Sequence, residues 1–164
     1  MTDSLVDEFV PIWTVILAVG VFLYVLLDGF DLGVGILYRF APDTASRNQM
    51  MNSIAPIWDG NETWLILGGV GLLVAFPLAF AIIIPAVYFP LLIMLLALIF
   101  RGVAFEFRFR DAPHRTFWDH GFNAGSTLAT FAQGVCWGRS SKASQSRAGP
   151  LLAAASTASP RFRS

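Results

Sequence analysis

Four acidic residues beside long apolar segments are the first candidates for chemistry in this chain. Asp28 and Asp31 are three residues apart, as are Asp59 and Glu62, so each pair lies on one face if its segment is helical. A carboxylate inside a bilayer costs about 2.5–3.5 kcal/mol, and such groups are by default functional candidates. Two carboxylates in a dry site repel each other when both are ionised, so one tends to keep its proton and the pair can pass protons.

The alternative is that these acids only mark the ends of membrane spans, where water at the headgroup level solvates them. For Asp28 and Asp31 both interpretations stay open, because the pair directly follows an uncharged run. For the second pair function is favoured, because Asp59-Gly60-Asn61-Glu62 lies between Trp58 and Trp64 and leads into a long uncharged stretch.

Histidine and cysteine give little support to a metal or haem site. His114 follows a proline in a charged loop and His120 lies at the mouth of the last apolar segment, so neither is at the depth of a span. Cys136 is the single cysteine, which excludes an internal disulfide, and it lacks the C-x-x-C-H pattern of covalent haem attachment. We therefore predict no metal ligands, no catalytic residues and no cofactor bound by this chain alone.

The elements that must position these residues are membrane helices. Of the 164 residues, 55% are hydrophobic and 13% are charged, and the mean hydropathy is +0.63. Soluble globular chains carry about 25% charged residues, so a soluble enzyme, a nucleic-acid-binding protein and a disordered adaptor are all poor interpretations. The composition predicts an all-α integral membrane helical bundle whose main solvent is the lipid bilayer.

Three strong spans are predicted from the uncharged runs. The first covers 9–27, close to the roughly 20 residues that one helix needs to cross the hydrocarbon core. The second uncharged run, 63–100, is too long for one span, so the chain is expected to turn within Phe76-Pro77-Leu78-Ala79. Span two would then cover 54–76 and span three 80–103, the latter kinked by two internal prolines.

A weaker span and a polar tail follow. Residues 121–138 carry no charge but contain Asn, Ser, Thr and Gln, which predicts a helix packed against protein more than lipid. Residues 139–164 are rich in Ser, Ala and Arg and contain no acid, a composition that cannot bury a core. We expect a four-helix membrane unit over 1–138 and a disordered basic tail over 139–164.

Basic residues before the tail predict the orientation of the spans. The loop after the first span contains Arg39 and Arg47, and four more arginines lie between Arg101 and Arg115. Two crossings separate these loops, so both lie on one side, which is expected to be the cytoplasm. The acidic N-terminus then faces outward, and it is unlike the basic start of a secretory signal, so the first apolar run is expected to stay as a span.

Three motifs follow one another along the chain. They are DGFDLGVG at 28–35, NSIAPIWDGNETWL at 52–65 and FRGVAFEFR at 100–108. In type and order they resemble subunit II of the cytochrome bd quinol oxidases, over roughly residues 5–135. The Glu62-Thr63-Trp64 form is similar to the cyanide-insensitive branch of that family.

This resemblance implies a bacterial inner-membrane complex that oxidises quinol, reduces dioxygen to water and builds a proton gradient. Haem b, haem d and the quinol oxidation site are expected in subunit I, the haem-bearing partner, while this chain would contribute assembly and proton access. Asp59 is the first candidate for proton uptake, and Glu62, Asp28 and Asp31 are further candidates for the proton route. Residues expected to shape the site are Trp58, Asn61 and Trp64, with Arg101 and Glu106 expected to pair or to anchor the end of span three.

The chain departs from this family in length and in its tail. Family members are more than twice as long and have two four-helix halves, whereas here the family-like helix gives way to the tail near 133–135. A reading-frame change in a GC-rich gene would produce such a tail, so we expect an N-terminal fragment with an aberrant end. Two other functions stay open: a fragment of a cation-coupled secondary transporter, whose paired carboxylates would bind the cation, and a purely structural membrane partner.

Overall fold

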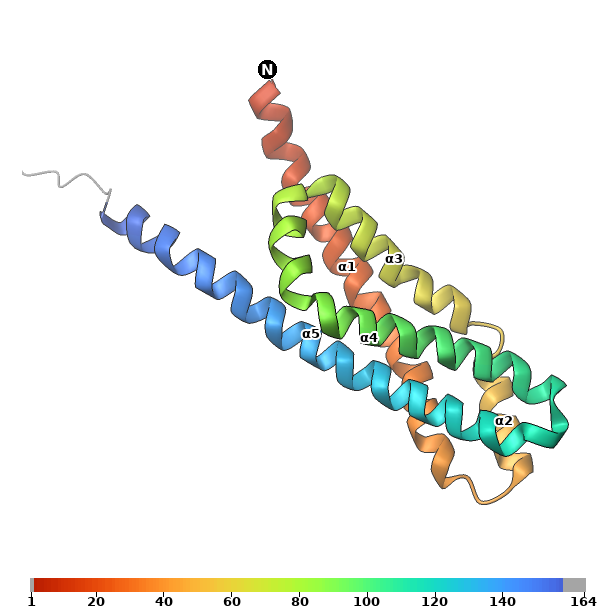
Figure 1. Ribbon diagram of the computed structural model, residues 1–164. Coiled ribbons are helices and arrows are strands. Elements are labelled where there is room, and N and C mark those ends of the chain that lie inside the picture. Colours follow the sequence, from red (N-terminus) through yellow and green to blue (C-terminus); the bar gives the residue numbers. More distant parts are fainter. Residues whose placement is uncertain (1, 158–164) are drawn as a thin grey trace, which may run out of the picture.

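The computed structural model describes residues 2–157, which form a set of helices (Figure 1). Side chains are described for 9–143, 145 and 146. The elements are α1 (Thr2–Leu37), η1 (Tyr38–Phe40), α2 (Thr44–Ile54), α3 (Trp58–Ala75), α4 (Pro77–Arg110), η2 (Ala112–His114) and α5 (Arg115–Thr157). No β-strand occurs in these described residues, which confirms the predicted all-α class.

The four long helices α1, α3, α4 and α5 form an antiparallel bundle. In Figure 1, α1 and α4 run toward the end of the bundle where α2 lies, and α3 and α5 run back. α1 lies beside α3 and α5, and α4 lies beside α5 and α3, so each long helix has two neighbours. Two buried clusters form the core: Leu32, Met94, Ala97, Leu98, Ala129 and Ala132 in one, and Tyr38, Met51, Ile54, Ala104, Phe105 and Phe122 in the other.

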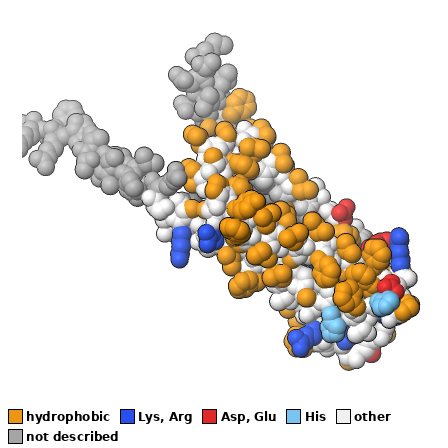
Figure 2. All heavy atoms as spheres, in the orientation of Figure 1, with side chains coloured by type: hydrophobic (Ala, Val, Ile, Leu, Met, Phe, Trp, Pro, Cys, Tyr) orange, Lys and Arg blue, Asp and Glu red, His pale blue; other side chains and the backbone are white. Residues whose placement is uncertain are grey.

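The outer surface of the bundle is strongly apolar, and Figure 2 shows hydrophobic side chains over most of its flank. Phe9–Phe40 and Pro77–Arg110 are long and apolar enough to cross a membrane by length and composition. They match the first and third predicted spans and support a membrane helical bundle. Within the described part of the chain no other helix meets both conditions, so the spans at 54–76 and 121–138 stay predictions.

α3 and α4 meet at the turn that the sequence predicts. α3 ends at Ala75, Phe76 alone links the helices, and Pro77 begins α4, where its missing N–H removes no helical hydrogen bond. Pro85 and Pro90 lie inside α4, and Figure 1 shows that this helix bends in its N-terminal part. α4 also continues past the predicted end of span three, because the charged segment after it is helical as far as Arg110.

Two segments differ from the sequence-based expectation. The polar connection after the first span contains the helix α2, whose N-cap Asp43 accepts a hydrogen bond from the backbone N–H of Ser46 at 2.7 Å. α5 continues as a helix through 139–157, where the composition predicts disorder. Once a helix has formed, each further residue is added at little cost, because it gains one hydrogen bond for each residue that it fixes. Residues 158–164 of the predicted tail lie outside the described residues.

Candidate functional site

Asp28 and Asp31 lie inside the bundle, and each is 0% exposed. Their three-residue spacing places both on the inner face of α1, as the sequence predicts. Arg101 of α4, also buried, donates through Nη1 to Glu62 Oε1 of α3 at 2.8 Å, and the same nitrogen lies 3.7 Å from Asp28 Oδ1. Three helices therefore meet at one group of side chains, called here the acidic cluster: Asp28, Asp31, Asn61, Glu62 and Arg101.

Asn61 connects the second acid of α1 to α3. Its Nδ2 donates to Asp31 Oδ2 at 2.8 Å, and it also lies 3.5 Å from the Leu27 carbonyl oxygen. Asn61 and Glu62 are adjacent on α3, so their side chains leave the helix about 100° apart. This difference in direction lets one side chain contact Asp31 while the other contacts Arg101.

The acidic cluster contains more acid than base, with three carboxyl groups around one guanidinium. Arg101 Nη1 is too far from Asp28 for a hydrogen bond, and Arg101 Nε, Arg101 Nη2 and Asp31 Oδ1 are buried without a hydrogen-bond partner among the described residues. A buried carboxylate without a cation is costly, so a carboxyl group in excess of the one arginine favours its protonated form. Such a cluster can take up and release protons within the bundle.

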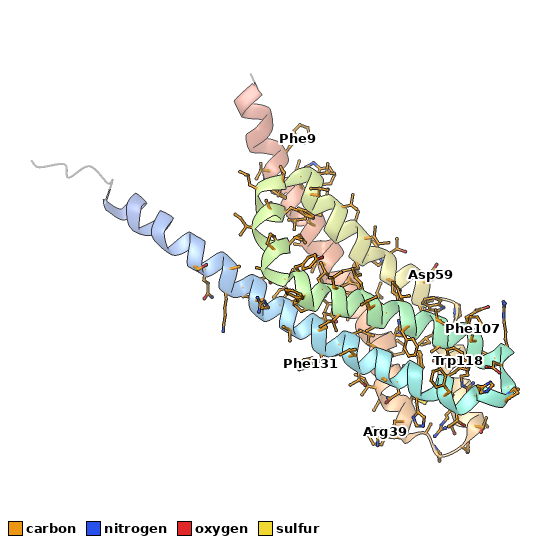
Figure 3. All side chains as sticks on the ribbon, viewed as in Figure 1. Phe9, Arg39, Asp59, Phe107, Trp118 and Phe131 are labelled. Carbon is orange, nitrogen blue, oxygen red and sulfur yellow. The ribbon has the colours of Figure 1, made fainter. Side chains whose placement is uncertain are left out.

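The other residues predicted around the site lie at its edge or outside it. Asp59 is exposed at the start of α3 (Figure 3), where no described side chain bonds to its carboxylate, although Glu62 is one turn away. Trp58 is half-buried and packs on the Phe105 ring with centroids 5.5 Å apart, and Trp64 is also half-buried. The structure thus separates Asp59 from the acidic cluster and places Glu62 within it.

Arg101 and Glu106 do not form the pair that the sequence suggested. Arg101 is engaged by Glu62 and Asp28, while Glu106 is exposed and pairs with Arg110. The reason is helical geometry, because residues five apart on a helix project about 140° from each other. Arg101 therefore belongs to the site through the bundle interior and Glu106 belongs to the surface.

A second buried polar group was not found from the sequence. Asp119 of α5 accepts hydrogen bonds from Tyr38 Oη at 2.6 Å, Arg108 Nε at 2.5 Å and Arg47 Nη1 at 3.2 Å. Arg108 Nη1 also donates to Asn48 Oδ1 at 2.7 Å, and Arg108 is 0% exposed. We call these five residues the Asp119 cluster. It connects η1, the end of α4 and the start of α5 to α2.

The Asp119 cluster holds helices together through ion pairs and is less suited to carrying protons. Burial alone would raise the pKa of the Asp119 carboxyl, but the hydrogen bonds from Tyr38 and Arg108 hold that pKa below its ordinary value. A sequence signal for it was available, since Arg101 and Arg108 are seven residues apart and therefore lie on one face of a helix. Charged residues on the inner face of an apolar helix need buried partners.

One aromatic side chain contacts a member of each cluster. Phe122 of α5 is 0% exposed, and its ring centre lies 5.8 Å from Arg101 Cζ of the acidic cluster. The Phe122 ring also packs edge-on against Tyr38 of the Asp119 cluster, with centroids 5.2 Å apart. Within the acidic cluster, Glu62 is the carboxylate whose side chain keeps partial exposure, at 23%.

The described residues do not fit a haem site. His114 is 71% exposed, and its Nδ1 lies 3.0 Å from both carboxylate oxygens of Asp111. His120 is also exposed, so neither imidazole faces an apolar pocket that could enclose a macrocycle. Over the part of the chain that the structure describes, no three His, Cys, Asp or Glu side chains converge on a position for a metal ion.

Comparison with known proteins finds the same family that the three sequence motifs suggest. The family model described as cytochrome bd terminal oxidase subunit II matches residues 10–159. Subunit 2 of the cytochrome bd-I ubiquinol oxidase of Escherichia coli (strain K12) is 38% identical over 130 residues, which cover 77% of this chain and 34% of that protein. Subunit 2 of the cytochrome bd ubiquinol oxidase of Bacillus subtilis (strain 168) is 39% identical over 128 residues, covering 76% and 38%. The chain spans about a third of the length of these relatives, and it belongs to the cytochrome bd terminal oxidase subunit II family.

Proposed function

We propose that this chain is a membrane subunit of a terminal quinol oxidase in aerobic respiration, in which quinol oxidation is coupled to the reduction of dioxygen to water. The family match and the relatives, whose names describe subunit 2 of ubiquinol oxidases, support this function. No catalysis is assigned to the chain by itself. Its proposed contributions are assembly of the complex and proton access.

The acidic cluster is the observation that carries the proton-access proposal. Asp28, Asp31 and Glu62 supply groups that can exchange protons, and Arg101 is the counter-ion that stabilises one ionised carboxylate at a time. Asn61 orients Asp31 through its hydrogen bond. Because Glu62 is the carboxyl group of this cluster that keeps partial exposure, it is the proposed point of exchange with the surface.

Asp59 is proposed as the outer member of the same route. It is exposed one helical turn before Glu62, so a proton held there has a short path to the partly exposed Glu62 carboxylate. Trp58 and Trp64, both half-buried, flank this region in the sequence. In this arrangement Asp59 collects protons and the buried acids store them.

The proposed location is the bacterial inner membrane, with the N-terminus and the turn at Phe76 outside and the basic loops in the cytoplasm. The hydrogen bonds that Asp119 accepts from Arg47 and Arg108 support the placement of both basic loops on one side of the membrane. The partner is the haem-bearing subunit I, which would supply the redox chemistry through haem b and haem d. Placement of the haems in subunit I is consistent with the exposed positions of His114 and His120, the two histidines of this chain.

Substitution within the acidic cluster of the assembled oxidase tests this function. A full-length subunit II with the same motifs is expressed with its partner, and oxygen consumption and haem content are measured for Asp28→Asn, Glu62→Gln and Asp59→Asn. Loss of turnover with normal haem content in these variants is expected. The matched control is Glu106→Gln, which removes an exposed acid that pairs with Arg110, outside the cluster. Normal turnover in all three variants would exclude the proton route, and loss of haem together with loss of assembly would support a purely structural role.

A further inference from the structure

α4 contains a break in its hydrogen bonding at Pro90. In an α-helix each backbone N–H donates to the carbonyl four residues earlier, and proline has no N–H, so the Ala86 carbonyl loses its helical donor. Within a bilayer such a free carbonyl is costly, and membrane helices tolerate internal proline where a neighbouring group satisfies it. The Ala86 carbonyl therefore needs a donor from outside its own helix.

Arg139 of α5 is that group. Its Nε donates to the Ala86 carbonyl oxygen at 2.6 Å. Arg139 and Ala86 meet because α4 and α5 pack antiparallel. The two helices are close at Gly125, where an added Cβ would lie 3.0 Å from the Ala97 carbonyl oxygen. From there α5 runs on toward Arg139 while α4 runs back toward Ala86. A guanidinium is a charged donor, and a charged donor makes a stronger bond to a carbonyl than a neutral one.

We propose that Arg139 replaces the backbone donor missing at Pro90 and thereby holds the bent part of α4 against α5. The bend in α4 (Figure 1) is a consequence of the two internal prolines, and the bond from Arg139 stabilises one of the carbonyls that they free. This clamp does not depend on the oxidase function. It gives a structural role to Arg139, which lies in the segment 139–164 that the composition predicts to be a disordered tail.

A double-mutant cycle between Arg139 and Pro90 tests the clamp on the full 164-residue chain in lipid. The reporter is Cys136, the single and half-buried thiol, which lies one turn before Arg139 on α5 and is expected to become more reactive when α5 separates from α4. The Arg139 charge also acts directly on this thiol, so the effect of Arg139→Ala is read as the difference between two backgrounds that lose this charge alike. Arg139→Ala is expected to raise the rate of maleimide modification several-fold, and at most about tenfold, which is the range of an ordinary net hydrogen bond and suits a donor side chain that is exposed. In the Pro90→Ala background residue 90 regains its N–H, so Arg139→Ala should there leave the rate nearly unchanged.

Two matched controls separate the clamp from a general effect of charge. Lys142→Ala removes an exposed cation about one turn further along α5, and it should leave the rate unchanged. Pro85→Ala restores the donor to a different carbonyl, that of Ala81, so the effect of Arg139→Ala should persist in that background. An equal effect of Arg139→Ala with and without Pro90 would overturn the clamp.

A second measurement keeps the test decisive if a proline variant fails to fold. The sequence contains two Ala–Val peptide bonds, after Ala18 and Ala86, so carbonyl-13C alanine with nitrogen-15 valine gives two correlated signals. Arg139→Ala should shift the carbonyl signal of Ala86 and leave that of Ala18 in place. An unmoved Ala86 signal would contradict the proposed bond.

Discussion

Gly35 marks the closest approach of α1 to α5, and replacing it with alanine should destabilise the bundle. A Cβ at this position would lie 2.0 Å from Ser126 Oγ and 2.5 Å from Ser126 Cβ. Rotation of the serine hydroxyl relieves the first contact but not the second, and Ser126 is buried with its Oγ bonded to the Phe122 carbonyl at 2.8 Å. Overpacking of a close interface typically costs 1–3 kcal/mol, so Gly35→Ala is expected to lower the free energy of unfolding by about 3 kcal/mol.

The assay is reversible unfolding of the purified chain in mixed micelles, with Gly33→Ala as the matched control. An added Cβ at Gly33 meets nothing within 4 Å, so this variant should be neutral or slightly stabilised, since alanine is the better helix former. Adding Ser126→Gly to Gly35→Ala removes the atoms that clash and should recover most of the lost stability. Equal effects at the two glycines, or no recovery in the double variant, would refute the close approach of α1 and α5.

The remaining predictions concern the Asp119 cluster. Asp119→Asn should lower the free energy of unfolding by about 3 kcal/mol, because Arg108 is fully buried and loses its charged partner; chemical unfolding measures this. The folded-state pKa of Asp119 lies below the unfolded value of about 3.9, so its stabilising contribution is present above that pH and is lost as the pH falls through the folded-state pKa. The stability difference between the unmodified chain and Asp119→Asn should therefore shrink on acidification, and a constant difference would be inconsistent with this linkage. Tyr38→Phe removes the hydroxyl that donates to Asp119 at 2.6 Å, so it should cost about 1–2 kcal/mol and raise the pKa of Asp119 in a carboxyl NMR titration.

Local signals explain which parts of the fold could be predicted from the sequence. The turn at Phe76-Pro77 follows from an uncharged run too long for one span, and the shared face of Asp28 and Asp31 follows from helical spacing. α2 was missed because its residues have little apolar periodicity and it forms against other elements, with Met51 and Ile54 buried in the second core cluster. The first two features are properties of a single segment, whereas α2 depends on tertiary packing.

The partners of buried charges could not be predicted in the same way. Sequence spacing gives the face on which a side chain lies but not the helix that it meets. Arg101 and Glu106 were therefore expected to pair or to anchor the end of span three, whereas Arg101 pairs with Glu62. Asp59 and Glu62 look equivalent in the sequence, yet the packing of α3 turns one outward and the other toward α4. Asp119 follows a charged loop, and its burial appears only when α2 and the ends of α1 and α4 are placed around it.

Oxygen-triggered proton uptake tests the central claim, that the acidic cluster carries protons for oxygen reduction, most directly. The assembled oxidase, with a full-length subunit II carrying these motifs, is placed in lipid vesicles, reduced, and mixed with oxygen while a pH-sensitive dye follows proton uptake. Glu62→Gln keeps the size of the side chain and can still contact Arg101 but cannot exchange a proton. It should slow proton uptake by about 100-fold at normal haem content, while Glu106→Gln leaves the rate unchanged. Proton uptake at the normal rate in Glu62→Gln would contradict the account.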